Sequence, residues 1–175
     1  ERVRAMPFQI DAWLPDGSRA LLVRISIRNP HETVSPVYWW SNITVEQTPD
    51  TRVLAPADDA LIYSYVRNAL VRTPLPLDGT DDLTYPGRER GSRDCFFRVP
   101  TDVRPWITSL DADGRGLFQT STSRLRGRKL FRWGIQTGGR QWQRFLETPD
   151  YIEIQAGLAR TQSHHLPMPP RTPRP

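Results

Sequence analysis

A carboxylate stands in the middle of a strand-like segment near the C-terminal end of the sequence. The segment Tyr151–Gln155 alternates polar and apolar side chains, and Glu153 is its one acid. A carboxylate in such a place can act as a general base or accept hydrogen bonds from a ligand. The same alternation fits an ordinary antiparallel strand that buries Ile152 and Ile154 and turns its polar side chains to solvent. The pattern leaves both interpretations open.

Flat aromatic rings and hydrogen-bonding groups are interleaved around this acid. The stretch Arg128–Gln162 contains rings such as Trp133 together with a lysine and several glutamines. A sugar offers C–H faces that stack on rings and hydroxyls that bond to amides and carboxylates. The combination favours a carbohydrate site in which Trp133 stacks on the sugar and Glu153 is a base or an anchor. The residues predicted to bind its hydroxyls are Asn42, Lys129, Gln155 and Gln162.

A second aromatic segment, Tyr38–Asn42, reads YWWSN and has the composition of a strand. Successive side chains of a strand point to opposite faces, so Tyr38 and Trp40 share one face and Trp39 takes the other. Core packing can account for one of these faces. The other face then forms an aromatic platform or a covered interface, and we predict Trp39 or Trp40 as a further stacking residue.

Short runs of β-branched and aromatic residues, separated by turn residues, make up most of the chain. The 175 residues include 17 prolines and 11 glycines, which disfavours long helices. We therefore predict an all-β fold, an antiparallel β-sandwich with few short helical turns. One domain is expected over residues 1–166, with a Pro-rich, disordered tail over 167–175. Because the sequence begins with Glu1 inside a strand-like pattern, we expect the sandwich to lack an N-terminal portion.

Two hairpins and one helical segment are indicated by local patterns. Phe8–Trp13 and Leu21–Ile27 flank a Pro-Asp-Gly-Ser turn, and a second pair of arms flanks the turn residues Asp111–Gly114. The spacing of Trp142, Phe145 and Leu146 predicts one or two helical turns. In contrast, the polar stretch from Thr73 to Arg93 is rich in Pro, Gly and Asp and predicts a long loop.

The net charge of +5 comes almost wholly from arginine, since Lys129 is the only lysine. The arginines are spread among acids rather than gathered, which favours a solvated surface over nucleic-acid binding. Arg124, Arg126 and Arg128 alternate with other residues and predict a basic stripe, the best candidate for an anion. This stripe supports a weaker alternative function, binding of anions or nucleic acid.

Cofactors, metals and membranes are not indicated. Cys95 is alone, so neither a disulfide nor a cysteine metal site is predicted, and the adjacent His164 and His165 lack partner ligands. The chain has no apolar run of transmembrane length and no signal peptide. We therefore expect a cytoplasmic protein that needs no cofactor.

Taken together, Asp16–Gly17, Ile27–Pro30, Tyr38–Ile43 and the triplet Glu153–Gln155 resemble the galactose-mutarotase-like superfamily. The segments KLFRWG and YIEIQAG are similar to an uncharacterised family within it that is often adjacent to tetratricopeptide repeats. The resemblance implies an antiparallel β-supersandwich, a carbohydrate ligand and neighbouring repeat domains. It also implies that Glu153 is the catalytic base.

The same resemblance places Tyr38 where mutarotases carry a catalytic histidine. A tyrosine with its ordinary pKa of about 10 is a poor acid near neutral pH. A glycosidase-like reaction would instead need a second carboxylate near Glu153. The sequence thus predicts a carbohydrate-recognising domain and leaves open whether it is an epimerase- or glycosidase-like enzyme. The alternative is a protein-interaction domain, and exposed sheet edges predict a homodimer.

Overall fold

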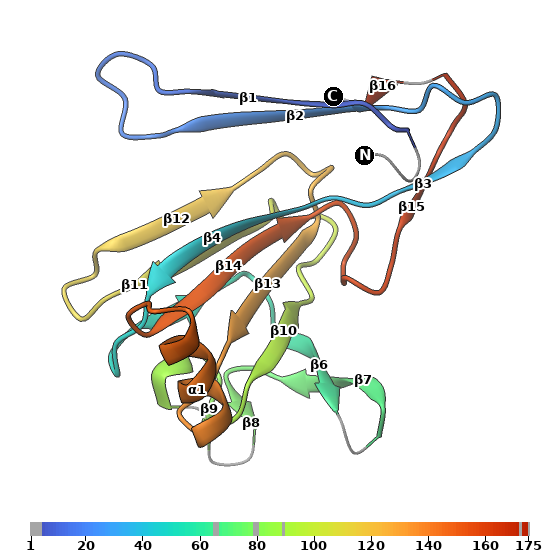
Figure 1. The fold of residues 1–175 in the computed structure, drawn as a ribbon. Coiled ribbons are helices and arrows are strands. Elements are labelled where there is room, and N and C mark those ends of the chain that lie inside the picture. The colour runs from blue at the N-terminus through green and yellow to red at the C-terminus, as the bar shows by residue number, and fades with distance from the viewer. Residues whose placement is uncertain (1–4, 65–66, 79–80, 89, 172, 175) are drawn as a thin grey trace. The chain divides into compact units, whose positions relative to one another are not determined.

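The computed structural model describes residues 5–64, 67–78, 81–88, 90–171 and 173–174 (Figure 1). Their contacts form two compact units: unit 1 combines Glu1–Val37 with His165–Pro175, and unit 2 is Tyr38–His164. Strands predominate in both units, and every paired ladder is antiparallel. The predicted all-β, antiparallel fold is therefore confirmed. No helix among the described residues combines the length and apolar character needed to cross a bilayer.

Unit 1 is built on the predicted hairpin. Strands β1 (Phe8–Trp13) and β2 (Leu22–Arg28) pair along their full length, and β16 (Pro173–Arg174) adds to β2. Gly17 takes the left-handed backbone conformation at the turn, with φ of 71°. Arg24 and Asp11, directly opposite each other, form an ion pair of 2.9 Å across the hairpin.

The end of the chain is paired with the rest of unit 1. Strand β15 (Leu166–Met168) pairs with β3 (Ser35–Val37). The side chain of Asn29, 1% exposed, donates to the carbonyls of Met168 and Pro169 at 3.0 Å each. One buried amide thus orders a segment whose composition alone suggests disorder.

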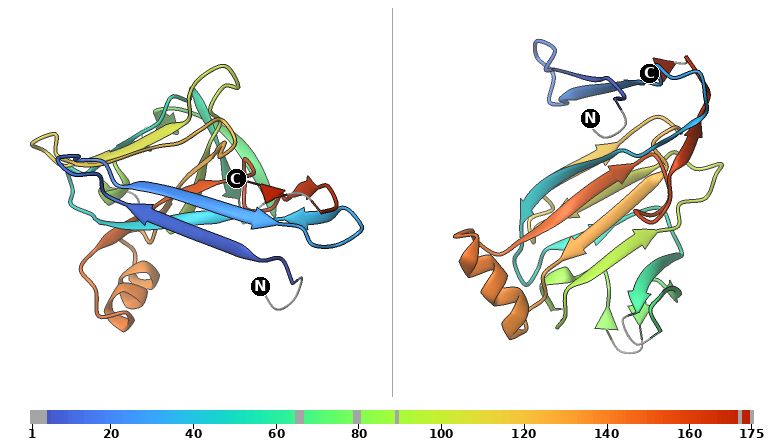
Figure 2. Two further views of the ribbon diagram at one scale, coloured as in Figure 1. Left: turned by 90° about the horizontal axis from the view of Figure 1, so that it is seen from above. Right: turned by 45° about the vertical axis from the view of Figure 1, so that its right-hand side comes forward.

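Unit 2 contains a six-stranded antiparallel sheet, whose middle strands lie side by side in Figures 1 and 2. Its strands, in spatial order, are β4 (Trp40–Glu46), β14 (Tyr151–Gly157), β13 (Gly127–Arg132), β10 (Arg93–Phe97), β6 (Asp59–Ser64) and β7 (Ala69–Pro74). Chain order and spatial order differ, so the centre of the sheet is assembled from segments far apart in the sequence.

A three-stranded sheet faces the six-stranded one across the core of unit 2. It consists of β12 (Gly116–Thr120), β11 (Trp106–Leu110) and β5 (Arg52–Leu54), and β11 with β12 is the second predicted hairpin. The core contains Val53 and Ile107 from this sheet and Leu130, Ile152 and Ile154 from the other. Ile152 and Ile154 are fully buried, which confirms the predicted inward face of β14.

The polar stretch between Thr73 and Arg93 is not a free loop, contrary to the sequence-based expectation. It contains β8 (Leu77–Asp78), β9 (Asp81–Asp82) and the short 3-10 helix η1 (Pro86–Arg88). Leu83 is 1% exposed and joins the core. The Thr84 carbonyl accepts a hydrogen bond of 2.7 Å from the Val53 N–H. Buried Leu83, Thr84 and Pro86 and a backbone bond to β5 hold a segment whose composition is typical of loops.

Helix α1 (Thr137–Phe145) confirms the predicted helical turns. Its orientation is unusual, because the buried residues are Gly139 and Gln143 while Trp142 and Phe145 are 54% and 76% exposed. A Cβ atom on Gly139 would overlap the carbonyl oxygen of Trp133. Gly139 therefore packs directly against the backbone at Trp133, and the large apolar side chains of the helix point outward.

The predicted basic stripe does not exist as a surface feature. Strand β13 begins at Gly127, after Arg124 and Arg126, and Arg128 is fully buried. The Arg128 guanidinium donates to the carbonyls of Leu125, Gly127 and Pro105, each at 2.8 Å, and to Ser121 Oγ at 2.6 Å. Burial lowers the pKa of Arg128 to about 10, and the nearby Arg126 adds repulsion. Arg128 thus binds backbone oxygens of its own chain.

Candidate functional site

The predicted polar residues lie on the face of the six-stranded sheet that points away from the core. Two neighbouring rows of side chains cross four of its six strands, β4, β14, β13 and β10. The first row, in register order, is Asn42, Gln155, Lys129 and Phe96. The second is Thr44, Glu153, Phe131 and Asp94. Because side chains alternate between faces, both rows lie opposite the buried Ile152 and Ile154.

Six side chains on this face form one continuous series of polar contacts, which we call the polar row. Asn42 Nδ2 and Gln155 Nε2 both donate to Glu153 Oε2, at 2.7 and 2.8 Å. Gln162 Nε2 donates to Gln155 Oε1 at 2.8 Å, and Lys129 Nζ donates to Gln162 Oε1 at 2.5 Å. The row ends where Lys129 Nζ lies 2.6 Å from Asp94 Oδ1.

The series of hydrogen bonds that runs from Lys129 through Gln162 and Gln155 to Glu153 has a fixed donor-to-acceptor direction. An ammonium group only donates and a carboxylate only accepts, so the amides of Gln162 and Gln155 have one possible orientation between them. Each amide passes a donor toward Glu153. Glu153 is thereby held by charge-assisted hydrogen bonds, which are stronger than bonds between neutral groups.

Exposure varies along the polar row. Lys129 is 4% exposed, and its Nζ atom lies 5.4 Å from the ring centre of Phe96 and 5.6 Å from that of Phe131. These cation–π contacts and the Asp94 carboxylate stabilise the charge in a buried position. The row reaches solvent on both sides of Lys129, because the Asp94 side chain is 34% exposed, Glu153 is half-buried and Asn42 is exposed.

Trp40 lies against the sheet beside this row. A Cβ atom on Gly127 or Gly157 would overlap its indole ring, so two glycines provide the flat surface on which it rests. The Trp40 ring also makes an edge contact with Phe96, with centroids 6.0 Å apart. Trp39, predicted as the alternative platform, is half-buried, and its carbonyl accepts a hydrogen bond of 3.1 Å from the Leu158 N–H.

A second series of contacts, which we call the aromatic row, leads from the sheet to helix α1. Phe131 and Trp133 meet edge to face at 4.8 Å, and Trp133 stacks on Trp142 at 5.9 Å with 22° between the planes. Tyr151 meets the edge of Trp133 at 6.3 Å, and Phe145 meets Trp142 at 5.8 Å. Trp133 was predicted as a platform, whereas Trp142 was read only as part of a helical face.

Tyr38 is separated from Glu153 along the chain and along the sheet. Thr44 lies opposite Glu153 and Trp40 lies opposite Gly157, about 13 Å away at the rise of a strand. Tyr38 precedes Trp40 by two residues, before β4 begins, and is 52% exposed. Burial of part of the side chain raises its pKa, which makes the phenol a weaker acid. The polar row joins Glu153 to the four predicted hydroxyl-binding residues, and Tyr38, predicted as a catalytic residue, is not part of it.

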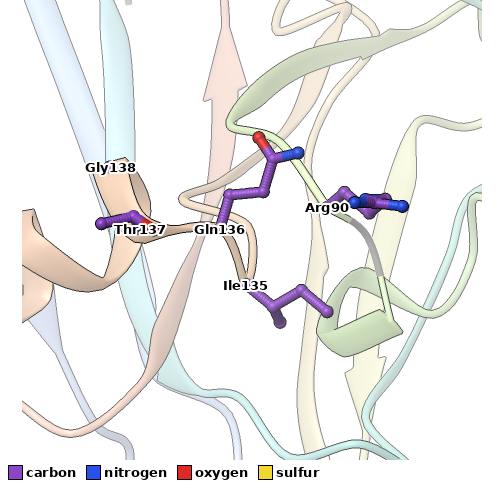
Figure 3. A pocket seen from close by; sticks show the side chains of 5 residues that line it. All are labelled: Arg90, Ile135, Gln136, Thr137 and Gly138. Carbon is purple, nitrogen blue, oxygen red and sulfur yellow. The ribbon is translucent and has the colours of Figure 1, made fainter.

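Two hollows in unit 2 lie outside the polar row. The first, about 700 Å³, is lined by Arg90 and by residues at the start of α1, whose side chains Figure 3 shows. The second, about 350 Å³, contains Asp59, which accepts hydrogen bonds from Arg72 at 2.7 Å and Arg98 at 2.9 Å. Desolvation raises the pKa of Asp59, but these bonds outweigh it and the net pKa is lowered. Ion pairs within the chain thus satisfy the principal charges of the second hollow.

The described residues include no group of three or more histidine, cysteine, aspartate or glutamate side chains that could hold a metal ion. The polar row itself consists of amides, one ammonium group and two carboxylates. Asp94 and Phe96 were missed as site residues, because their sequence segment carries no signal beyond that of a strand.

Comparisons with known proteins place the fold. A solved structure of a TPR-domain containing protein from Parabacteroides distasonis ATCC 8503 superposes with a TM-score of 0.80 at 24% identity. The superposition covers 99% of this chain and 29% of that one, so this chain spans less than a third of the other protein's solved length. No curated protein matches the sequence. Residues 1–171 match a family described as a domain of unknown function, DUF5107, and the chain belongs to that family.

Proposed function

We propose that this domain recognises a carbohydrate at the Glu153 end of the polar row. The observation that carries the proposal is the row itself, which holds Glu153 in one orientation by amides that a buried Lys129 aligns. Sugar sites in proteins combine a few fixed polar groups with flat apolar surfaces. Both are present on one face of the six-stranded sheet.

The Glu153 end of the row offers acceptors for sugar hydroxyls. Both hydrogen bonds to Glu153 from the described residues go to Oε2, and Oε1 is the oxygen available to a ligand hydroxyl. The Oδ1 atom of Asn42 and the hydroxyl of exposed Thr44 lie on the same face. Trp40 and Phe131 add ring surfaces close to these groups. Hydroxyls and C–H faces of one sugar ring match this set.

The resemblance to the galactose-mutarotase-like superfamily supports the same ligand class and the role of Glu153. Recognition is favoured over proton transfer, because Tyr38 lies too far along the chain to act opposite Glu153. A second carboxylate is present on the same face, since Asp94 is two strands away from Glu153, roughly 10 Å between backbones. Asp94, however, is already engaged in the ion pair with the buried Lys129. In the complete protein, we propose that tetratricopeptide repeats adjoin this domain.

Replacing Glu153 with glutamine is expected to weaken sugar binding at least tenfold. The substitution keeps the shape but removes the negative charge with which Oε1 would accept a sugar hydroxyl, and such a charge-assisted bond contributes about 1.5–3 kcal/mol. Isothermal titration calorimetry with a panel of common monosaccharides and short oligosaccharides measures the change.

The matched control is Asp113→Asn, which removes a charge at the exposed β11–β12 turn. This variant should bind the panel as the unchanged chain does. The proposal is overturned if no sugar binds the unchanged chain, or if Glu153→Gln and Asp113→Asn bind equally well. Thermal unfolding of both variants shows whether either substitution disturbs the fold.

A second function, self-association, is favoured by a separate observation in unit 1. Phe8, Ile10 and Val23 share one face of the β1–β2 hairpin and are 53%, 51% and 52% exposed. Strand β1 is also the edge of its sheet. An exposed apolar face on the edge strand of a sheet is suited to pack against a second copy of the chain.

Sedimentation velocity is expected to show a dimer at micromolar concentration that Ile10→Lys converts to a monomer. A lysine on the apolar face leaves a charge without a partner when two hairpins meet. Gln9→Lys is the control, because Gln9 is exposed on the opposite face of the same strand. A concentration-independent monomer in the unchanged chain contradicts this second function.

A further inference from the structure

The aromatic row begins beside the Glu153 end of the polar row and leads away from it. Phe131 lies directly opposite Glu153 in the β13–β14 pair. Trp133 follows at 4.8 Å from Phe131, and Trp142 follows at 5.9 Å from Trp133. Both centroid separations are within the range of direct contact between aromatic rings. The rings therefore extend the site by more than the width of one sugar, toward α1 at the foot of β13 and β14 (Figure 1).

Helix α1 holds the far end of this row in place. Gly139 allows the helix to approach the carbonyls of Trp133 and Gly134 so closely that any side chain there would collide with them. Trp142 is consequently supported on one face by Trp133, and it remains 54% exposed. Trp142 is in ring contact with Phe145, which is 76% exposed, and such a contiguous exposed apolar surface is typical of an interaction site.

We infer that the ligand is an oligosaccharide whose successive rings follow the aromatic row from Glu153 to Trp142. This inference rests on the proposed function, because it takes the Glu153 end of the polar row as the first subsite. A first sugar bonds to Glu153 and Asn42. A later sugar of the same chain stacks on the exposed face of Trp142. A free monosaccharide occupies the first subsite alone and forgoes the stacking contact.

Calorimetric titration of the 175-residue chain with ladders derived from cellulose, chitin and galactan, each from monomer to hexamer, tests the inference. Affinity should rise with chain length and then reach a plateau. Trp142→Ala should weaken the longer oligomers by about tenfold, the effect of one ring contact, and leave the monomer unchanged. Trp142→Phe should recover part of the loss, because it restores a flat ring.

Phe118→Ala is the matched control, since Phe118 is a 62% exposed aromatic residue that stacks on Trp106 in the other sheet. It should bind every oligomer normally. Equal affinity for monomer and hexamer, with Glu153→Gln weakening both, would overturn the extended site and leave the carbohydrate function standing. Absence of binding for every ladder would overturn both. Circular dichroism of Trp142→Ala separates a lost contact from a lost helix.

Discussion

Replacing Arg128 with leucine is expected to lower the free energy of unfolding by about 3–5 kcal/mol. The side chain is fully buried and supplies hydrogen bonds to three carbonyls and one hydroxyl. Leucine would leave these four acceptors without that donor, and a buried unsatisfied acceptor costs about 1–3 kcal/mol. Removing a buried charge recovers part of this loss, which keeps the total below the sum of the bonds. Urea unfolding followed by circular dichroism gives the value.

Arg128→Lys separates the charge of this residue from its shape. Lysine keeps the positive charge but has a single nitrogen, which cannot reach the spread acceptors that the planar guanidinium reaches. It should therefore destabilise the chain by about 2 kcal/mol, whereas Arg115→Leu, in the exposed β11–β12 turn, should change stability by less than about 0.5 kcal/mol. Unchanged stability in Arg128→Lys would show that the hydrogen-bond geometry is unimportant.

Replacing Gly157 with alanine is expected to destabilise unit 2 by about 3 kcal/mol, the upper part of the range for overpacked sites. The new methyl group would overlap the Trp40 indole, and the rigid ring cannot relieve the overlap without moving as a whole. The ring must leave the sheet, so the intrinsic fluorescence should also change. Thermal and urea unfolding measure the loss of stability.

A double variant tests whether Trp40 is the cause. The atoms closest to a Cβ on Gly157 all belong to Trp40, whereas a Cβ on Gly127 would also overlap the carbonyl oxygen of Ala159. In a Trp40→Ala background, Gly157→Ala should therefore cost less than about 1 kcal/mol, while Gly127→Ala remains costly. Equal costs of Gly157→Ala in both backgrounds would assign the effect to the strand backbone instead.

Local patterns were sufficient for the elements that depend on neighbouring residues. The hairpin of β1 and β2 follows from the Pro-Asp-Gly turn, and Gly17 adopts the conformation that such a turn requires. The inward face of β14 follows from alternation, because Ile152 and Ile154 are both in the core. These features need no knowledge of the distant parts of the chain.

Features that depend on distant partners could not be predicted from the sequence. The helical spacing of Trp142 and Phe145 predicted α1 correctly, but the pattern does not show that Gly139 and Gln143 form its buried face. Arg128 was predicted to lie on the surface because arginine usually does. The sequence does not reveal that its acceptors include the Pro105 carbonyl, 23 positions away. Both errors have one origin, namely that packing overrides the usual preference of a residue type.

The candidate site lies between these two cases. Residue types alone singled out Glu153, Gln155, Lys129 and Gln162, since few other groups suit a sugar. Their assembly depends on the register of three strands, β4, β14 and β13, which the sequence does not specify. The pairing of β10 with β13 adds Asp94, which lies opposite Phe131, whereas Tyr38 precedes β4 and has no place in these ladders.

The fixed direction of the polar row also restricts how such a sequence can diverge. An amide side chain keeps nearly the same shape after a half-turn, so Gln155 and Gln162 could serve either polarity. Reversing the polarity, however, requires the charges at positions 129 and 153 to be exchanged together with both amide orientations. A chain that has changed only one end places two donors or two acceptors face to face. We therefore expect the ammonium and the carboxylate, which come from the neighbouring strands β13 and β14, to change only together.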